Sequence, residues 1–440
     1  MSKITVKACW FVVVMIAILA GGCGKKSQVA IGDADILHNN EDQLTQIIIY
    51  DVFTPPVASR IYSYSSLATY EAIRYTDPKY QSIVSKLNGF DEMPKPEYGK
   101  NYNYTLAATK AFFTVVRKVV FSVDSLDAYE NKTYGDFKGE MDDSTYARSV
   151  RFGEAIGKAV LERSAKDNYK LTRGKPKFLG SNIPGEWRPT APDYMDGVEY
   201  CWGTMKTFAL DSSSQFPCPK PVKFSTDSNS AFYKQMLEVY NINKNLTTEQ
   251  RTIAKYWDDN PFVIEHSGHM SFATKKITPG GHWIGITAIA CKASKADAVK
   301  TAKAYALTSV AMYDAFISCW QDKYVTKVVR PITVINEYIN QQWLPLLQTP
   351  PFPEYPSGHS AITRAAATVL TNLFGDNFKF NDTSDLRYIG MQREFKSFIQ
   401  AANEASISRV YGGIHYMSGV KAGADQGKKV GDYVLNKLSF

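Results

Sequence analysis

The sequence predicts an all-α fold built from two helical bundles packed together. Helical spacing of apolar residues dominates the chain, we find no convincing set of strands, and one helical segment recurs in both halves. The chain has 440 residues, of which 44% are hydrophobic and 21% are charged. This composition is sufficient to bury one large core or two moderate ones.

The first 22 residues have the three parts of an export signal. Lys3 and Lys7 lie near the start, an apolar run follows over residues 10–19, and small residues come next. The alternatives are an ordinary signal peptide and a membrane helix, but the apolar run is short for a membrane span. We therefore expect residues 1–22 to be a cleaved signal peptide.

The cleavage region also indicates lipidation. Leu19-Ala20-Gly21-Gly22-Cys23 is similar to a bacterial lipobox, with the leucine one place early. Cys23 is then the acylated first residue of the mature protein, and residues 23–40 are a lipid-anchored linker. We expect an exported lipoprotein of the bacterial cell envelope, in the periplasm or at the outer membrane, attached to the membrane by its lipid.

Helical periodicity gives the order of elements in the mature chain. Helices are expected over roughly residues 42–75, 103–121, 145–168, 247–257, 284–321, 332–345, 358–374, 386–404 and 418–437. Between about residues 171 and 232, Gly, Pro, Ser and aromatic residues follow no period, which indicates a long ordered excursion over the surface. We assign residues 41–258 to an N-terminal bundle that carries this excursion, and residues 259–440 to a C-terminal bundle.

An internal similarity supports the two bundles. Residues 60–73 align without gaps on residues 303–316, with tyrosines, a serine, two alanines and an acid at matching places. Each copy is followed by a similar short piece, Asp77-Pro-Lys79-Tyr80 in the first and Asp322-Lys323-Tyr324 in the second. Either the two bundles are related, or two amphipathic helices rich in Ala and Tyr match by chance.

Charge and cysteine content exclude some classes of function. The net charge of +8 is modest for this length, and basic residues alternate with acidic ones, so we expect no nucleic-acid partner. Cys201 and Cys218 lie in one irregular stretch and are able to pair in an oxidising envelope. Cys291 and Cys319 lie in helical patterns, which is typical of buried thiols, and no cysteine spacing indicates a zinc site.

Three separated pieces in the last third of the chain carry residues suited to binding an oxyanion. They are Lys323-Tyr-Val-Thr-Lys-Val-Val-Arg330-Pro331, Pro356-Ser357-Gly358-His359 and Ser408-Arg409-Val-Tyr-Gly-Gly-Ile-His415. A tetrahedral oxyanion carries two or three negative charges, which the two guanidinium forks and the lysine can match. The Ser-Gly pair starts a predicted helix, where exposed N–H groups bind anions well.

The order and spacing of these pieces resemble the signature shared by type 2 phosphatidic acid phosphatases, bacterial acid phosphatases and vanadium-dependent haloperoxidases. Further pieces look like those of the longer, two-bundle haloperoxidase-like proteins: Gly185–Pro192, Trp202-Gly203, Tyr256–Pro261 and Thr278–Trp283. The resemblance is sharp in the last third and loose in the first half. It implies a phosphatase/haloperoxidase-like fold and a phosphate- or vanadate-binding site made by Lys323, Arg330, Ser357, Gly358 and Arg409.

The resemblance implies different tasks for the two motif histidines. His415 attacks phosphorus in a phosphatase or ligates vanadium in a haloperoxidase, whereas His359 is the acid–base group. Attack and ligation both need a neutral imidazole, which nearby cations favour. Proton delivery needs an imidazole near its working pKa. Gly412 and Gly413 are expected to bend the chain so that Arg409 and His415 face the same anion.

One position departs from the family pattern. Family members usually carry an acid four residues after the second histidine, but this chain has Gly419 there. Asp425 is the only carboxylate nearby in sequence, and a backbone carbonyl or Asp314 are the other candidates to orient the ring. Asp314 is either a partner of a site cation or an ordinary helix-surface carboxylate. The loss of an orienting group typically costs about ten- to a hundredfold in activity.

Three further histidines are predicted to be ordinary hydrogen-bonded residues. His266-Ser267-Gly268-His269 imitates the Ser-Gly-His piece but lacks the proline and the partner pieces. His282 is expected near the pocket entrance. A metal ligand is the less favoured interpretation of all three.

We rank three functions. The first is hydrolysis of a small-molecule or lipid phosphate ester through attack by His415, which needs no cofactor. The second is oxidation of halide by hydrogen peroxide with vanadate as cofactor, since the same pocket holds vanadate. The third is non-catalytic binding of a phosphorylated ligand, for which Gly419 is the only support.

Overall fold

The computed structural model describes residues 32–261, 263–267 and 269–439. Its α-helices are α2 (Asp33–Tyr50), α3 (Pro55–Ile73), α4 (Tyr104–Val119), α5 (Val123–Asp136), α6 (Asp143–Ala165), α7 (Tyr169–Arg173), α8 (Ala231–Lys244), α9 (Thr248–Tyr256), α10 (Pro279–Ala293), α11 (Ala298–Thr326), α12 (Pro331–Tyr338), α13 (Gly358–Phe374), α14 (Leu386–Ile389), α15 (Phe398–Tyr411) and α16 (Met417–Lys437). There are also short 3-10 helices η1 (Arg74–Thr76), η2 (Val84–Lys86) and η3 (Trp202–Thr204). Two small antiparallel hairpins complete the set, β1 (Val263–Ser267) with β2 (Met270–Thr274) and β3 (Phe380–Asp382) with β4 (Arg393–Phe395). The predicted all-α fold is confirmed, with the hairpins as minor additions.

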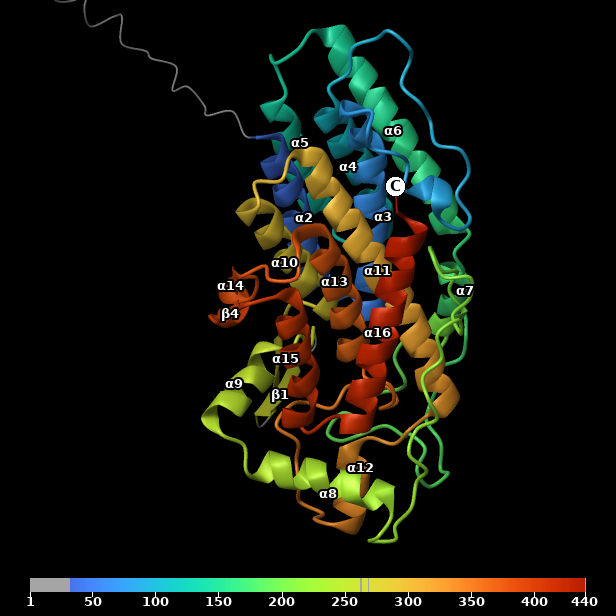
Figure 1. Ribbon diagram of the computed structural model, residues 1–440, viewed down its shortest axis with the longest axis vertical. Coiled ribbons are helices and arrows are strands. Elements are labelled where there is room, and N and C mark those ends of the chain that lie inside the picture. Colours follow the sequence, from blue (N-terminus) through green and yellow to red (C-terminus); the bar gives the residue numbers. More distant parts are fainter. Residues whose placement is uncertain (1–31, 262, 268, 440) are drawn as a thin grey trace, which may run out of the picture. The chain divides into compact units, whose positions relative to one another are not determined.

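Two groups of helices pack around the adjacent helices α3 and α11. α4 and α6 pack against α3, whereas α10, α13 and α16 pack against α11. In Figure 1, α5 and α6 lie at one end of this unit, and α8 and α12 lie at the opposite end. The predicted pair of helical bundles is therefore confirmed. α8 and α9 belong to the predicted N-terminal bundle in sequence but pack against α12 and α15, so the boundary at residue 258 stays a prediction.

The two segments of similar sequence form the central helices of the two bundles. Residues 60–73 lie on α3 and residues 303–316 lie on α11, and these two helices pack directly against each other. All residues of α3 from Pro56 to Ile73 are buried. Small side chains allow close approach, and Ser63 Oγ donates a hydrogen bond of 2.8 Å to the Ser309 carbonyl. A helix that is buried on all sides belongs at the centre of the protein, and the polar side chains of α3, such as Ser63 and Glu71, are buried together with the apolar ones.

The excursion between residues 171 and 232 is anchored by a buried carboxylate of α11. Asp314 accepts hydrogen bonds from the backbone N–H groups of Phe208 and Ala209, both at 2.7 Å, and Leu210 at 2.9 Å. Burial raises the pKa of Asp314 to about 6, against the effect of these three donors. Because Asp314 is fully buried and its described partners are these amides, both interpretations left open for it, a partner of a site cation and a helix-surface carboxylate, are wrong. Its oxygens are already used to hold the excursion.

We expect Asp314→Ala to destabilise the protein by about 3 kcal/mol, because three buried N–H groups lose their acceptor. The measurement is the free energy of unfolding in urea, with the exposed Asp376→Ala as control. Equal stability of the two variants would show that the excursion does not depend on this carboxylate.

The N-terminal and cysteine predictions have mixed outcomes. Residues 1–22 and Cys23 lie outside the described residues. The predicted linker over residues 23–40 is wrong for its last part, because α2 begins at Asp33 and buries Ile36 and Leu37. Cys201 and Cys218 are both free thiols, so the possible disulfide between them is not formed. Among the described helices, none is both long and apolar enough to cross a membrane.

Candidate active site

The three sequence motifs meet because each site residue lies at the end of a helix. The seven residues occupy the last turn of α11 (Lys323), the start of α12 (Arg330), the start of α13 (Ser357, Gly358 and His359), the last turn of α15 (Arg409) and the connection between α15 and α16 (His415). α13 packs against α11, α15 and α16, which brings these ends together. Arg330 Nη1 lies 3.1 Å from His415 Nε2. Motif residues as far apart in sequence as Lys323 and His415 thus form one buried site.

Three cations line this site and all are buried. Lys323 and Arg330 are 0% exposed and Arg409 is 1% exposed. Lys323 Nζ donates to the carbonyls of Pro353 at 2.8 Å and Glu354 at 3.0 Å, which leaves one of its three N–H groups for a ligand. Burial lowers the pKa of Lys323 to about 7 and that of Arg330 to about 10. Such a concentration of buried positive charge is costly without an anion.

The two guanidinium groups are fixed by backbone carbonyls and still have free donors. Arg330 donates to the carbonyls of Phe352 and Ile414, both at 2.8 Å, and Arg409 donates to that of Trp257 at 2.6 Å. In the described part of the chain, Arg330 Nη2 and Arg409 Nε have no hydrogen-bond partner. Buried donors are rarely left unpaired in proteins. These N–H groups therefore fit a tetrahedral oxyanion such as vanadate or phosphate.

The start of α13 adds neutral donors to the cations. Ser357 is the N-cap of this helix, and its Oγ accepts a hydrogen bond from the N–H of Ser360. The N–H of Gly358 is at the first helical position, where no intrahelical acceptor exists. A Cβ on Gly358 would lie 3.2 Å from the Trp320 ring, so glycine allows the close packing of this turn. This geometry is typical of an anion site at a helix N-terminus.

His415 has the protonation state that ligation requires. Arg330 can only donate, so the Nε2 atom at 3.1 Å from it accepts and carries no proton. In a neutral ring the proton is then on Nδ1, which lies 2.6 Å from Glu354 Oε1. Burial and the charges of Arg330 and Lys323 hold the pKa of His415 well below its usual range. The ring is neutral and its Nε2 lone pair is directed toward the cations.

Glu354 is the functional residue that the sequence interpretation missed. Its Oε1 accepts from His415 Nδ1 and, at 3.2 Å, from the N–H of Tyr416. A Cβ on Gly419 would come closer to Glu354 Oε1 than the 3.0 Å that real Cβ atoms keep. Glu354 therefore occupies the space next to the position where the family usually has its acid.

The other candidates for orienting His415 are excluded by their positions. Asp314 is used by the excursion, and Asp425 is exposed on α16. The only signal for Glu354 in the sequence is a lone acid in the proline-rich segment before the Pro-Ser-Gly-His piece. Its distance of 61 residues from His415 gave no reason to pair the two.

His359 lines a cavity of about 150 Å³ next to the cations, with Arg409, Phe352 and Asp259 also in its wall. Its Nε2 lies 3.7 Å from Asp259 Oδ2 and has no hydrogen-bond partner among the described residues. Burial, followed by the charge of Arg409, holds the pKa of His359 well below its usual range. A bound oxyanion would raise that pKa toward the range in which proton exchange is efficient.

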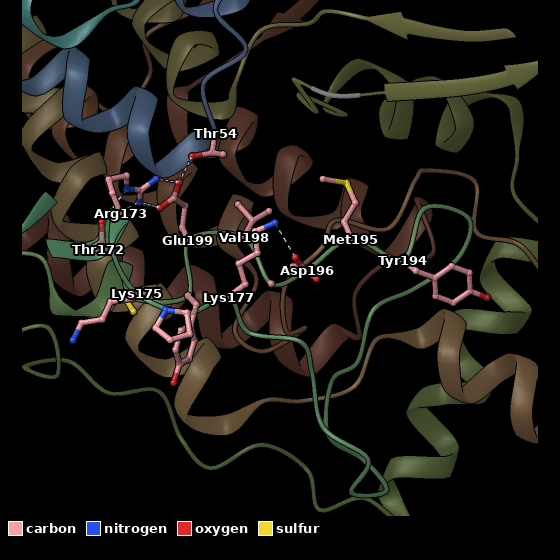
Figure 2. Close-up of a pocket in the computed structure, with 14 residues that line it drawn as sticks. Thr54, Thr172, Arg173, Lys175, Lys177, Tyr194, Met195, Asp196, Val198 and Glu199 are labelled. Carbon is pink, nitrogen blue, oxygen red and sulfur yellow. Dashed lines mark hydrogen bonds and ion pairs between the residues drawn. The ribbon is translucent and has the colours of Figure 1, made fainter. Parts of the chain in front are cut away.

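A larger and more open hollow of about 500 Å³ adjoins this cavity, and the two share Thr54, Met195 and Val198. Figure 2 shows the hollow with the ion pair between Arg173 and Glu199 in its wall. The excursion between residues 171 and 232 supplies most of this lining. The excursion therefore forms most of the wall of the approach to the site.

The remaining sequence-predicted histidines lie elsewhere. His282 is 0% exposed and its ring contacts Asp259 and Asp382, so the prediction that it lies at the pocket entrance is wrong. His266 lies on β1, and the exposed His269 directly precedes β2.

Comparison with known proteins identifies the family. A family model described as the VCPO second helical-bundle domain matches residues 303–342 and 338–440. A solved structure of a bacterial vanadium-dependent iodoperoxidase is 43% identical, with a TM-score of 0.86 over 92% of this chain and 96% of that one. Holo and apo structures of a bacterial vanadium-dependent chloroperoxidase are each 17% identical, with TM-scores of 0.68 and 0.67, over 88% of this chain and 93% and 95% of theirs. No protein with a curated description matches the chain.

These matches correct the order of the predicted functions. The relative that covers nearly the whole chain at 43% identity is an iodoperoxidase, so the prediction of phosphate-ester hydrolysis as the main activity is wrong. The signature motifs alone did not separate the two because both reactions use the same oxyanion pocket. The chain belongs to the vanadium-dependent haloperoxidase family.

Proposed function

We propose that this protein is a vanadium-dependent haloperoxidase that oxidises iodide with hydrogen peroxide. The observation that carries the proposal is the neutral His415 with its Nε2 lone pair among three buried cations, in a chain 43% identical to an iodoperoxidase. The overall reaction consumes iodide, hydrogen peroxide and one proton and yields hypoiodous acid and water. Iodide is favoured over other halides because the relative of 43% identity is an iodoperoxidase.

Each site residue has a specific part in this proposal. Lys323, Arg330 and Arg409 would neutralise the oxygens of vanadate, with the Ser357 hydroxyl and the Gly358 N–H as additional donors. When bound, vanadate is the Lewis-acid centre at which peroxide is activated for oxygen transfer to halide.

The two histidines have separate parts. His415 would supply the nitrogen ligand through Nε2, because Glu354 keeps the ring proton on Nδ1. His359 lines the adjoining cavity. It would accept a proton from hydrogen peroxide and donate one to the water that leaves.

The test is an assay of purified protein with orthovanadate, hydrogen peroxide and iodide, followed through triiodide absorbance, and a separate assay with p-nitrophenyl phosphate. We expect iodide oxidation that requires both vanadate and peroxide. Phosphate release without any peroxide-dependent iodide oxidation would refute the proposal.

Vanadate binding should weaken above neutral pH. Burial lowers the pKa of Lys323 to about 7, so the free site loses this charge as the pH rises. A bound oxyanion raises the pKa again, and binding then takes up a proton. We expect the apparent dissociation constant of vanadate to rise by up to about tenfold per pH unit between pH 7.5 and 9. Comparison of ⁵¹V NMR titrations of wild type and Lys323→Arg checks this, since the pH dependence should be weaker in the arginine variant.

We also propose that the protein is exported and lipidated at Cys23. The N-terminal sequence supports this through its basic start, its apolar run and the lipobox-like residues 19–23. Metabolic labelling with a radioactive fatty acid is the test, and incorporation that persists in Cys23→Ala would contradict it.

A further inference from the structure

A buried cluster of one histidine and three aspartates lies behind His359. His282 is in the first turn of α10, and its Nδ1 is 2.9 Å from Asp259 Oδ1. Its Nε2 is 2.9 Å from Asp382 Oδ2, and Asp385 Oδ2 is 3.7 Å from Nδ1. All four side chains are between 0% and 3% exposed. Four ionisable side chains are rarely buried together, and such clusters are frequent at functional sites.

The contacts of His282 determine its charge. A carboxylate oxygen faces each ring nitrogen at hydrogen-bond distance, and a carboxylate only accepts. Both nitrogens must therefore carry a proton, which makes the ring an imidazolium. Burial alone would lower the pKa of His282, but the three aspartates raise it well above its usual value.

The same aspartate contacts both His282 and the active-site histidine. Asp259 Oδ1 meets His282, whereas its Oδ2 lies 3.7 Å from His359 Nε2. Among the described residues, Asp259 Oδ2 and His359 Nε2 have no hydrogen-bond partner. The backbone φ of Asp259 is +43°, in the left-handed region that aspartate adopts more readily than most non-glycine residues. His282 is the group that holds this side chain.

Other groups pack around the cluster. Lys276 pairs with Asp258 at 2.7 Å, and the Trp257 ring stacks on His282 with centroids 4.5 Å apart. Tyr256 contacts the edge of the same ring and its hydroxyl donates to the Asp382 carbonyl. Burial raises the pKa of Asp385 to about 7, so this acid titrates near neutral pH.

The charge of His282 also affects the pKa of His359 in the active site. Burial and Arg409 are the main reasons for the low pKa of His359, and the positive charge of His282 lowers it further. Lys323 and Arg330 act in the same direction. Removal of the His282 charge should therefore raise the pKa of His359.

We propose that His282 is a positioning residue for halide oxidation: a permanently charged imidazolium that fixes Asp259 and, through it, the orientation and protonation of His359. This role rests on the proposed haloperoxidase function. No covalent step is involved, since His282 only holds its neighbours.

The first test measures the charge of His282 without any catalysis. The chain has six histidines, so ring ¹⁵N NMR of vanadate-free protein is tractable, with Asp382→Asn and His282→Gln to assign the signal. We expect both ring nitrogens of His282 to bear protons from pH 6 to 9 and its signal to move in Asp382→Asn. A ring with one proton, or one that titrates in this range, would overturn the proposal even if the protein oxidises no halide.

The second test compares His282→Gln with a matched control, His38→Gln. His38 is another buried histidine, 5% exposed and bonded to Tyr305. In His282→Gln we expect kcat for iodide to fall about tenfold and the pH limb governed by His359 to move up by about 0.5–1 pH unit. The vanadate dissociation constant should stay within about threefold, because the polar contacts of His282 in the described part of the chain all go to aspartates and not to anion-binding residues. The control should behave as wild type.

Two results of this comparison would overturn the proposal. One is a pH profile of His282→Gln that superimposes on that of wild type. The other is a parallel loss of vanadate affinity and activity, which would indicate that His282 only supports the fold. If His282→Gln does not fold, His282→Asn replaces it, because it also removes the imidazolium charge, and we expect a shift of the same limb in the same direction. Absence of halide oxidation by wild type would instead refute the proposed function, and the NMR result would still decide the charge of His282.

Discussion

Replacement of His415 by alanine is expected to abolish iodide oxidation, with a loss of at least about a thousandfold in kcat. The variant removes the nitrogen that the structure directs at the oxyanion site, and it also removes the partner of two buried groups. Arg330 Nη1 loses its contact at 3.1 Å and Glu354 Oε1 loses its contact at 2.6 Å. Without the proton of the His415 ring, the Glu354 carboxylate keeps the Tyr416 N–H, and its charge would compete with vanadate for Lys323 and Arg330.

The measurements for His415→Ala are vanadate affinity by ⁵¹V NMR and triiodide formation at saturating vanadate. We expect affinity to fall by about a hundredfold or more. His269→Ala is the control, because His269 is exposed and precedes β2. Activity of His415→Ala above a tenth of wild type would show that another group ligates vanadium.

The helical order was predictable because the apolar periodicity is strong, but helix breaks without Gly or Pro were not. The predicted helix 358–374 coincides with α13, where Ser357 is a clear N-cap. The predicted helix 284–321 is split into α10 and α11, because Lys295 adopts φ +51° and Asp297 starts a new helix. Local composition gives a weak signal for a lysine in the left-handed region.

The predicted helix 386–404 fails for a related reason. The structure has the short α14, then β4, then α15 from Phe398. β4 pairs with β3 through Phe380 and Phe395, which are both buried. Such pairing is a tertiary effect that overrides helix propensity in a short segment.

The site residues were predictable only where they lie close together in short sequence motifs. The seven motif residues lie together because each piece carries its own helix end. Glu354 and the contacts of His282 escaped because Glu354 lies 61 residues from His415 and Asp382 lies 100 residues from His282, and no spacing rule connects them. Groups that orient a catalytic side chain are selected for where they lie in space, so they can come from any element.

Substitutions at positions 354 and 419 can test whether an acid at position 419 replaces the acid at position 354. Glu354→Ala is expected to lower kcat by about a hundredfold, since His415 loses the acceptor that fixes its tautomer. Gly419→Asp alone should also be impaired, because its Cβ would overlap Glu354 Oε1. The two positions compete for one space, and only one acid fits there.

The double variant Glu354→Ala, Gly419→Asp decides whether the two acids are equivalent. The smaller side chain at 354 frees the space that the Cβ at 419 needs, and an aspartate there can reach His415 Nδ1, as the family pattern implies. We expect the double variant to recover at least about tenfold of the activity lost in Glu354→Ala, with kcat for iodide and vanadate affinity as readouts. Glu354→Gln should stay impaired, because its amide accepts a hydrogen bond but carries no charge to stabilise the ring proton. If the two substitutions were instead additive in their loss, the carboxylate of Glu354 would act through the backbone N–H of Tyr416, which also donates to it, and not through His415.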